Sequence, residues 1–134
     1  MMTIHLRGTL RQLGREDGVA TSAIVIPGTV LLVVIALQCA LWFLGGNIAQ
    51  NAAMDAYRDA RAYQSTTDAG TAAAGSVLTL TGGFLDNPTV QVQRTATTVT
   101  VTVTGDAVSL IPGLSLPPVQ RSITGPVERW IPAP

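Results

Sequence analysis

The order of apolar and polar positions divides the chain into four parts. Residues 1–17 form a short polar and basic tail, and no charged side chain occurs from Gly18 to Met54. Within that stretch, Ala23–Leu44 is a 22-residue apolar run rich in Ile, Val and Leu. As a helix this run is about 33 Å long, enough to cross a hydrocarbon core of about 30 Å. The pattern predicts one transmembrane helix, which we place at residues 18–46.

Two other interpretations of the apolar run are weaker. A small protein cannot easily cover a helix that is apolar on all sides, which disfavours a buried core helix. The apolar region of a signal peptide is typically ~7–15 residues long, shorter than this run. Gln38 before Cys39 also fits poorly with a lipoprotein signal. We expect a mature start at Met1 or Val19, whereas a start at Ala40, or between Asn51 and Ala53, would indicate a signal peptide cleaved near Ala49.

The distribution of arginines predicts the orientation of the helix. Three arginines precede the apolar run, at positions 7, 11 and 15, and Arg58 and Arg61 follow it at a greater distance. Cytoplasmic flanks carry the excess of positive charge close to the membrane. We therefore expect a cytoplasmic N-terminus and a single pass through the cytoplasmic (inner) membrane. The chain after Asn47 then lies outside.

A stripe of small residues characterises the next part, an Ala-rich helical region over residues 47–80. Spacings of four and three put one set of residues on one helix face: Ala49, Ala53, Ala56, Ala60 and Tyr63. Small side chains allow a neighbouring element to approach closely. The neighbour is either a partner subunit or the protein's own C-terminal sheet. We expect the sheet to cover part of the stripe, and partner contacts to lie around Ala49 and Ala53.

Within the same region, the segment Gln64–Asp68 predicts a break, because Ser, Thr and Asp compete for backbone hydrogen bonds. The helix is expected to resume over Ala69–Leu80. Its inward residues are then Ala72, Ala73, Ser76, Val77 and Leu80.

The last part, residues 81–134, is predicted to be a small β-rich domain. Valines and polar residues alternate over Thr89–Thr95 and Thr97–Thr104, which favours two strands joined in a hairpin through Arg94–Ala96. A third strand is expected over Val119–Thr124. Turns are expected at Gly82-Gly83 and at Asp86-Asn87-Pro88, and the strand end at Gly125-Pro126. The Pro-rich loop Val108–Pro118 either covers the sheet edge or dips toward the membrane.

These elements predict an α+β fold. A single N-terminal transmembrane helix continues into an Ala-rich extramembrane helix, which packs on a small antiparallel sheet of about three strands.

Charge and composition exclude several functions. Eight basic residues balance eight acidic ones, so no basic surface favours nucleic acid. Apolar residues make up 47% of the chain and charged residues 12%, which argues against disorder. One Cys and one His, His5, leave neither a disulfide framework nor a Cys/His zinc site. Asp55 and Asp59 share a helix face, but Arg58 beside them favours solvation over cation binding. We expect no cofactor and no enzyme activity.

Two residues inside the apolar run have specific interpretations. Cys39 is expected to behave as a small hydrophobic residue. Gln38 carries a polar amide that needs a partner, either on another helix or within its own turn. The candidate helix-packing residues are Pro27, Gln38, Ala49, Ala53, Ala56 and Ala60.

Several segments together resemble one known family. They are Asp17-Gly18, Ala23–Pro27 at the head of the apolar run, the Ala-rich helix Asn47–Arg61, the strand Val99–Val103 and the ending Gly125–Trp130. This combination is similar to the TadE-like family, the minor-pilin or pseudopilin-like proteins of tight adherence (Tad) pilus and secretion systems, particularly its actinobacterial branch.

The resemblance implies a single-pass subunit that joins, primes or caps a pilus. The resemblance implies partners: the major pilin, the membrane platform proteins, the secretion ATPase and, where the chain is processed, a prepilin peptidase. Family members usually carry a Glu near the start of the helix, whereas Thr21 and Ala23 occupy the corresponding positions here. The candidate processing site is Gly18-Val19. The alternative function is a single-pass or secreted envelope protein whose outer β-domain binds another protein or a surface ligand.

Overall fold

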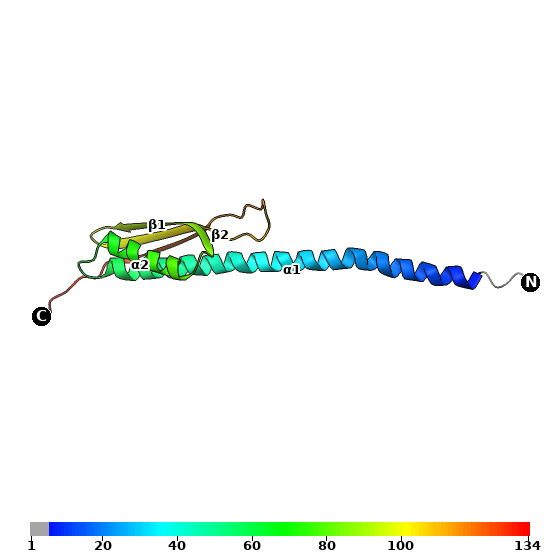
Figure 1. The fold of residues 1–134 in the computed structure, drawn as a ribbon. Coiled ribbons are helices and arrows are strands. Elements are labelled where there is room, and N and C mark those ends of the chain that lie inside the picture. The colour runs from blue at the N-terminus through cyan, green and yellow to red at the C-terminus, as the bar shows by residue number, and fades with distance from the viewer. Residues whose placement is uncertain (1–5) are drawn as a thin grey trace, which may run out of the picture. The chain divides into compact units, whose positions relative to one another are not determined.

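The structure, a computed structural model, describes the backbone of residues 6–134 and the side chains from residue 18 on. The basic side chains expected to orient the helix, at positions 7, 11 and 15, lie outside this description. The described elements are two helices and three strands: α1 (Leu6–Arg61), α2 (Thr67–Leu80), β1 (Leu85–Arg94), β2 (Thr98–Ala107) and β3 (Val119–Pro126). This is the expected α+β fold, shown in Figure 1.

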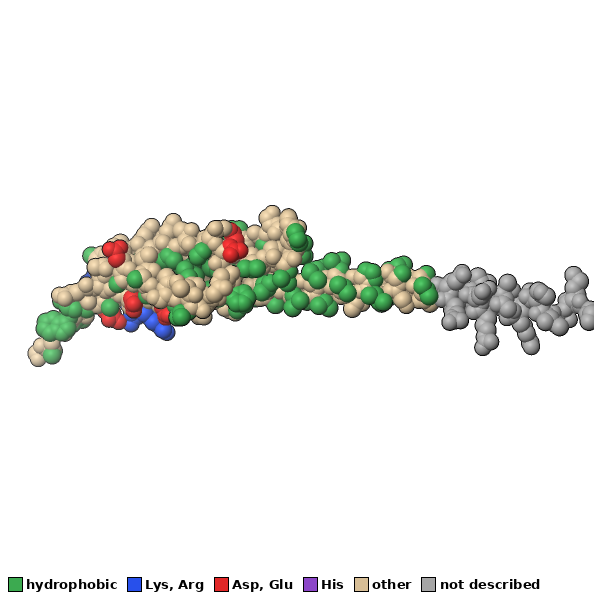
Figure 2. All heavy atoms as spheres, in the orientation of Figure 1, with side chains coloured by type: hydrophobic (Ala, Val, Ile, Leu, Met, Phe, Trp, Pro, Cys, Tyr) green, Lys and Arg blue, Asp and Glu red, His purple; other side chains and the backbone are tan. Residues whose placement is uncertain are grey.

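The chain separates into two compact units, residues 1–37 and residues 38–134. The first unit holds the apolar part of α1 from residue 18 to residue 37, and nearly every side chain in that part is exposed, including Ile24 and Leu32. Figure 2 shows hydrophobic but no charged side chains along this part of the helix. Gly18–Arg61 is the one helix in the described part of the chain that is long and apolar enough to cross a membrane.

The second unit is built on the C-terminal part of α1. Its alanines at positions 49, 52, 53, 56 and 60 are 0% exposed and share one core with Val99, Val101 and Val103 of β2. The expected helical stripe therefore packs on the protein's own sheet. Tyr63 was expected to extend the stripe, but α1 ends at Arg61 and Tyr63 is exposed.

The sheet is antiparallel in the order β1-β2-β3. Val92 pairs with Val101, and Val101 pairs with Ile123 on the other side. Because side chains alternate along a strand, the valines of β2 face the core while its threonines face outward. On that outer face Thr100 pairs its hydroxyl with that of Thr124 at 3.1 Å. The predicted hairpin is confirmed, with the Thr95 amide donating to the Thr98 carbonyl at 2.8 Å.

Helix α2 begins at Thr67, inside the predicted break Gln64–Asp68 and two residues before the expected start at Ala69. Thr66 caps it by accepting from the Ala69 amide. Its inward face differs from the expected one. Gly70 and Ala74 are buried and Val77 and Leu78 are partly buried. In contrast, part of the expected inward set is exposed: Ala72, Ser76 and Leu80. The reason is close packing of Gly70 on α1, which turns this face of α2 inward.

Strand β1 begins earlier than the alternating pattern indicated. The expected turn Asp86-Asn87-Pro88 lies within β1, where the register shifts between Asp86 and Thr89 and Asn87 has a φ of 47°. Leu85 belongs to the strand because its side chain fills the space over Gly105, where no Cβ would fit. Strand β3 likewise continues through Gly125 and Pro126.

Candidate functional site

The candidate processing site lies inside a helix. Gly18 and Val19 both belong to α1, and the Ser22 hydroxyl donates to the Gly18 carbonyl at 2.8 Å. A peptidase that cuts an extended substrate would have to unwind this turn. Pro27 is also inside α1 and is exposed. Because proline has no N–H, the carbonyl four residues earlier, that of Ala23, lacks its usual helical donor.

Gln38 makes a polar contact between α1 and the rest of the second unit. Its side chain is 5% exposed. The amide nitrogen donates to the Val108 carbonyl at 3.1 Å, and the amide oxygen accepts from the Leu110 N–H at 2.7 Å. The partner is thus neither another helix nor Gln38's own turn, the two possibilities expected from the sequence. Gln38 instead holds the first residues of the loop Val108–Pro118.

A tryptophan one helical turn away holds the other end of the same loop. The indole N–H of Trp42 donates to the Pro117 carbonyl at 3.3 Å, and its ring meets that of Phe43 edge-on at 5.5 Å. Just beyond, a Cβ on Gly45 would lie 3.3 Å from the Cβ of Ala107. The absence of a side chain there lets the end of β2 approach the helix closely. The loop is therefore fixed along α1 at both of its ends.

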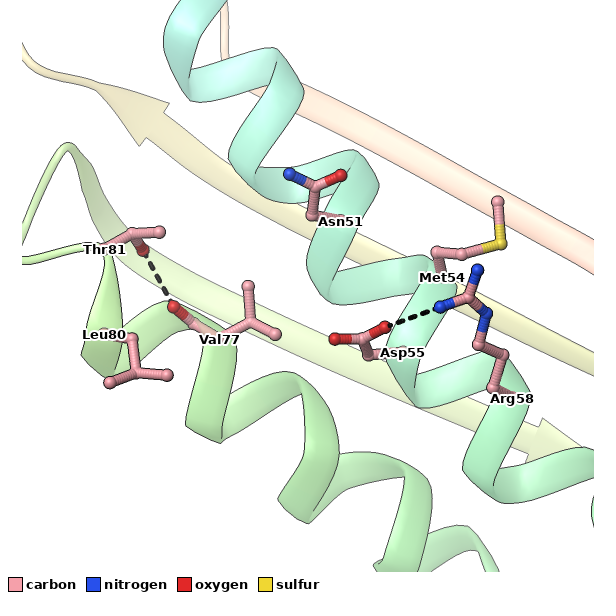
Figure 3. A pocket seen from close by; sticks show the side chains of 7 residues that line it. All are labelled: Asn51, Met54, Asp55, Arg58, Val77, Leu80 and Thr81. Atoms are coloured by element: carbon pink, nitrogen blue, oxygen red, sulfur yellow. Dashed lines mark hydrogen bonds and ion pairs between the residues drawn. The ribbon is translucent and has the colours of Figure 1, made fainter.

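A groove of about 400 Å³ lies between the outer faces of α1 and α2. Figure 3 shows its lining residues: Asn51, Met54, Asp55, Arg58, Val77, Leu80 and Thr81. Asp55 and Arg58 form an ion pair at 3.5 Å, as expected for a solvated helix face, and Leu80 is 86% exposed. Among the lining residues, no nucleophile lies next to a base.

At its C-terminal end, α1 is joined to the tail of the protein. The Arg61 guanidinium contacts the Glu128 carboxylate at 2.7 Å, while the Glu128 N–H donates to the Arg61 carbonyl at 2.9 Å. The Tyr57 hydroxyl donates to the Pro126 carbonyl at 3.4 Å. Tyr57 and then Glu128 raise the pKa of Arg61 above its usual value, so Arg61 stays charged. Two segments that carry the family resemblance, Asn47–Arg61 and Gly125–Trp130, thus meet here.

The structure also assigns places to the candidate packing residues on the Ala stripe. Ala49, Ala53, Ala56 and Ala60 all lie in the core of the second unit. The sheet leaves the side chains of Ala49 and Ala53 no exposed surface, so these two side chains are not available to a partner. Partner contacts around these positions stay a prediction.

Other contacts were not expected from the sequence. Gly70 packs against α1, and Arg61 pairs with Glu128, across 67 positions of sequence. Helix α2 contains two glycines, Gly70 and Gly75, and only Gly70 approaches another element closely, so the glycines alone do not identify the contact. The Arg61–Glu128 pair leaves no local signal.

Within the part of the chain that the structure describes, no cluster of His, Cys, Asp and Glu could hold a metal ion. Cys39 is a free thiol on the exposed side of α1. Comparison with models of known protein families, with curated proteins and with solved structures finds no match to this chain.

Proposed function

We propose that this protein is a membrane-anchored, TadE-like minor pilin or assembly component of a Tad-type pilus or secretion system, and that it is not an enzyme. The observation that carries the proposal is that two parts of α1 have different environments. One helix supplies an apolar, exposed segment at its N-terminal end and the core of a small α+β domain at its C-terminal end.

The exposed apolar segment of α1 must be covered by other molecules, because the described part of the chain does not pack over it. Only 6% of its most apolar window is buried. Exposed side chains such as Ile24, Leu31 and Leu32 are stable in lipid or against equivalent helices of other subunits. A pilus subunit requires both covers in turn, since it is stored in the membrane and then packs into a filament. The contact of Arg61 with Glu128 in the C-terminal tail adds support, because it joins two segments that carry the family resemblance, Asn47–Arg61 and Gly125–Trp130.

The proposed orientation has the N-terminus in the cytoplasm and the second unit outside. Reporter fusions after Thr104 test it directly. We expect alkaline phosphatase fused there to be active and a cytoplasmic reporter fused there to be inactive. The opposite pattern would overturn the orientation and the pilin-like function with it.

The function itself is tested by deleting the gene in its source organism and counting surface pili by electron microscopy. We expect loss of pili or of secretion, restored by the intact protein and by Leu31→Ala. Leu31→Arg should fail to restore them, because a charge at the centre of a span costs about 2.5–3.5 kcal/mol on insertion scales. Normal pili and secretion in the deletion strain would contradict the proposal.

The groove between α1 and α2 supports a second candidate function. Its exposed Leu80 and partly exposed Met54 offer an apolar contact beside the Asp55–Arg58 ion pair. An envelope protein that binds another protein through this groove would lose that binding on Leu80→Asp, while pilus number would stay normal in the deletion strain.

A further inference from the structure

Two uncharged segments lie against each other in the second unit. One is Gln38–Leu44, the last two turns of the apolar run. The other is the loop Val108–Pro118, which has no charged residue; the nearest charges in sequence are those of Asp106 and Arg121. The hydrogen bonds of Gln38 and Trp42 join the two segments at both ends of the loop. The apolar run therefore does not stop where the folded unit begins.

The length of the helix before Gln38 places the two turns Gln38–Leu44 at the edge of a bilayer. Gly18–Leu37 is a helix of about 30 Å, which already matches a hydrocarbon core of about 30 Å. The uncharged helix nevertheless continues to Leu44 and beyond. Residues 38–44 then fall in the interfacial layer, where amphipathic aromatic residues such as Trp42 are enriched. Because the loop is bonded to the same two turns, it falls at the same depth.

The side chains of this region suit lipid. Leu110 and Leu114 on the loop are 50% and 41% exposed, and Phe43 on the helix is 64% exposed. Between helix and loop lies a cavity of about 330 Å³. It is lined by Gln38, Cys39, Trp42, Phe43, Leu116 and Pro117. An apolar surface of this kind is unfavourable in water and favourable against acyl chains.

Part of the loop backbone has its hydrogen bonds satisfied within the protein, which suits a medium poor in water. A polar backbone group without a partner is costly in such a medium. The Leu110 N–H donates to Gln38, the Ile111 N–H to the Ser109 hydroxyl at 3.3 Å, and the Leu114 N–H to the Ile111 carbonyl at 3.2 Å. Three further positions have no N–H to satisfy: Pro112, Pro117 and Pro118.

We propose that the loop Val108–Pro118 is a second membrane-binding element, which inserts Leu110 and Leu114 into the interfacial layer of the leaflet next to the second unit. The inference rests on the proposed anchoring by α1. The occupant of the surface is lipid rather than protein, because the surface is continuous with the apolar run and carries no charge. Since no cationic side chain takes part, insertion does not require anionic lipid.

The full-length protein in phosphatidylcholine vesicles tests the proposal. In a Cys39→Ala background, one cysteine is introduced at Leu114 and labelled with an environment-sensitive fluorophore, and nitroxide-labelled phosphatidylcholine is used as quencher. Leu31→Cys serves as the control within the anchor. Ala96→Cys serves as the control in water, since Ala96 is exposed at the opposite end of β2 from the loop, about 30 Å away along the strand.

We expect quenching at Leu114 to lie within a factor of about two of that at Leu31, as for an interfacial position, with none at Ala96. Adding anionic phosphatidylglycerol to the vesicle or adding salt should leave it unchanged. If the probe at Leu114 is unquenched and water-like while the probe at Leu31 is quenched, the loop proposal is wrong and the anchor stands. The apolar surface of the loop would then bind a protein partner. Lack of quenching at Leu31 would overturn the anchor, and the loop proposal with it.

Discussion

Helix α2 offers a pair of glycines that tests how it packs on α1. Gly70 faces α1: a Cβ added there would lie 2.8 Å from the Ala56 carbonyl oxygen and 2.9 Å from the Cβ of Ala60. Both atoms belong to the rigid part of α1, so neither can move aside cheaply. Gly75, in the same helix, has no atom within 4 Å of such a Cβ.

Gly70→Ala and Gly75→Ala therefore differ in packing but share the same gain in helix propensity. That gain is about 1 kcal/mol for alanine over glycine. Overpacking at Gly70 costs about 1–3 kcal/mol. We expect Gly75→Ala to raise the free energy of unfolding by up to about 1 kcal/mol. Gly70→Ala should lie about 1–3 kcal/mol below Gly75→Ala, because the propensity term cancels between the two.

Denaturant unfolding of the full-length protein in detergent micelles measures this difference. Trp42 reports the second unit, since its ring packs between α1 and the loop that follows β2. The midpoints give the difference when the two slopes agree. Equal stabilisation by both alanines would refute the packing of α2 on α1 through Gly70.

Three further changes test other contacts. Ala56→Leu should lower the stability of the second unit by about 1–3 kcal/mol in thermal melts, since Ala56 has no exposed surface, whereas the exposed Asp59→Ala should change it by at most about 0.5 kcal/mol. Arg61→Ala should release the C-terminal tail to limited proteolysis, and Arg58→Ala should not; equal tail cleavage in both variants would refute the tail contact. Gln38→Ala should leave the N–H of residue 110 without a partner, at about 1–3 kcal/mol, and an unchanged exchange rate for that amide would contradict the contact.

Patterns with a strict period determine the parts of the fold that the sequence predicts well. Strict alternation of Val and Thr places β2 and its inward valines, and the spacing of alanines places the buried face of α1. Both patterns act through burial, which depends on the period alone. The pattern of α2 is different, because Ala, Ser and Gly differ too little in hydrophobicity to distinguish one helix face from the next. Shape decides its orientation, through the close contact at Gly70.

The contacts of the candidate site depend on pairings that are distant in sequence. Gln38 meets Leu110, 72 positions away, and Arg61 meets Glu128, 67 positions away. A polar residue in an apolar run signals that a partner exists, but the partner's identity follows only from the folded chain. The same holds for the Ala stripe, whose spacing fits a partner subunit and the protein's own sheet equally well.

The most direct test of the proposed function is photo-crosslinking from the exposed part of α1 in living cells. A photoreactive phenylalanine analogue at Leu31, which is 57% exposed, reaches whatever covers this part of the helix. The same analogue at Ala96 provides the control. We expect adducts from Leu31, absent from Ala96, with the major pilin or the membrane platform proteins of a Tad system. Adducts with lipid alone, or with an unrelated envelope protein while pili form normally, would contradict the account.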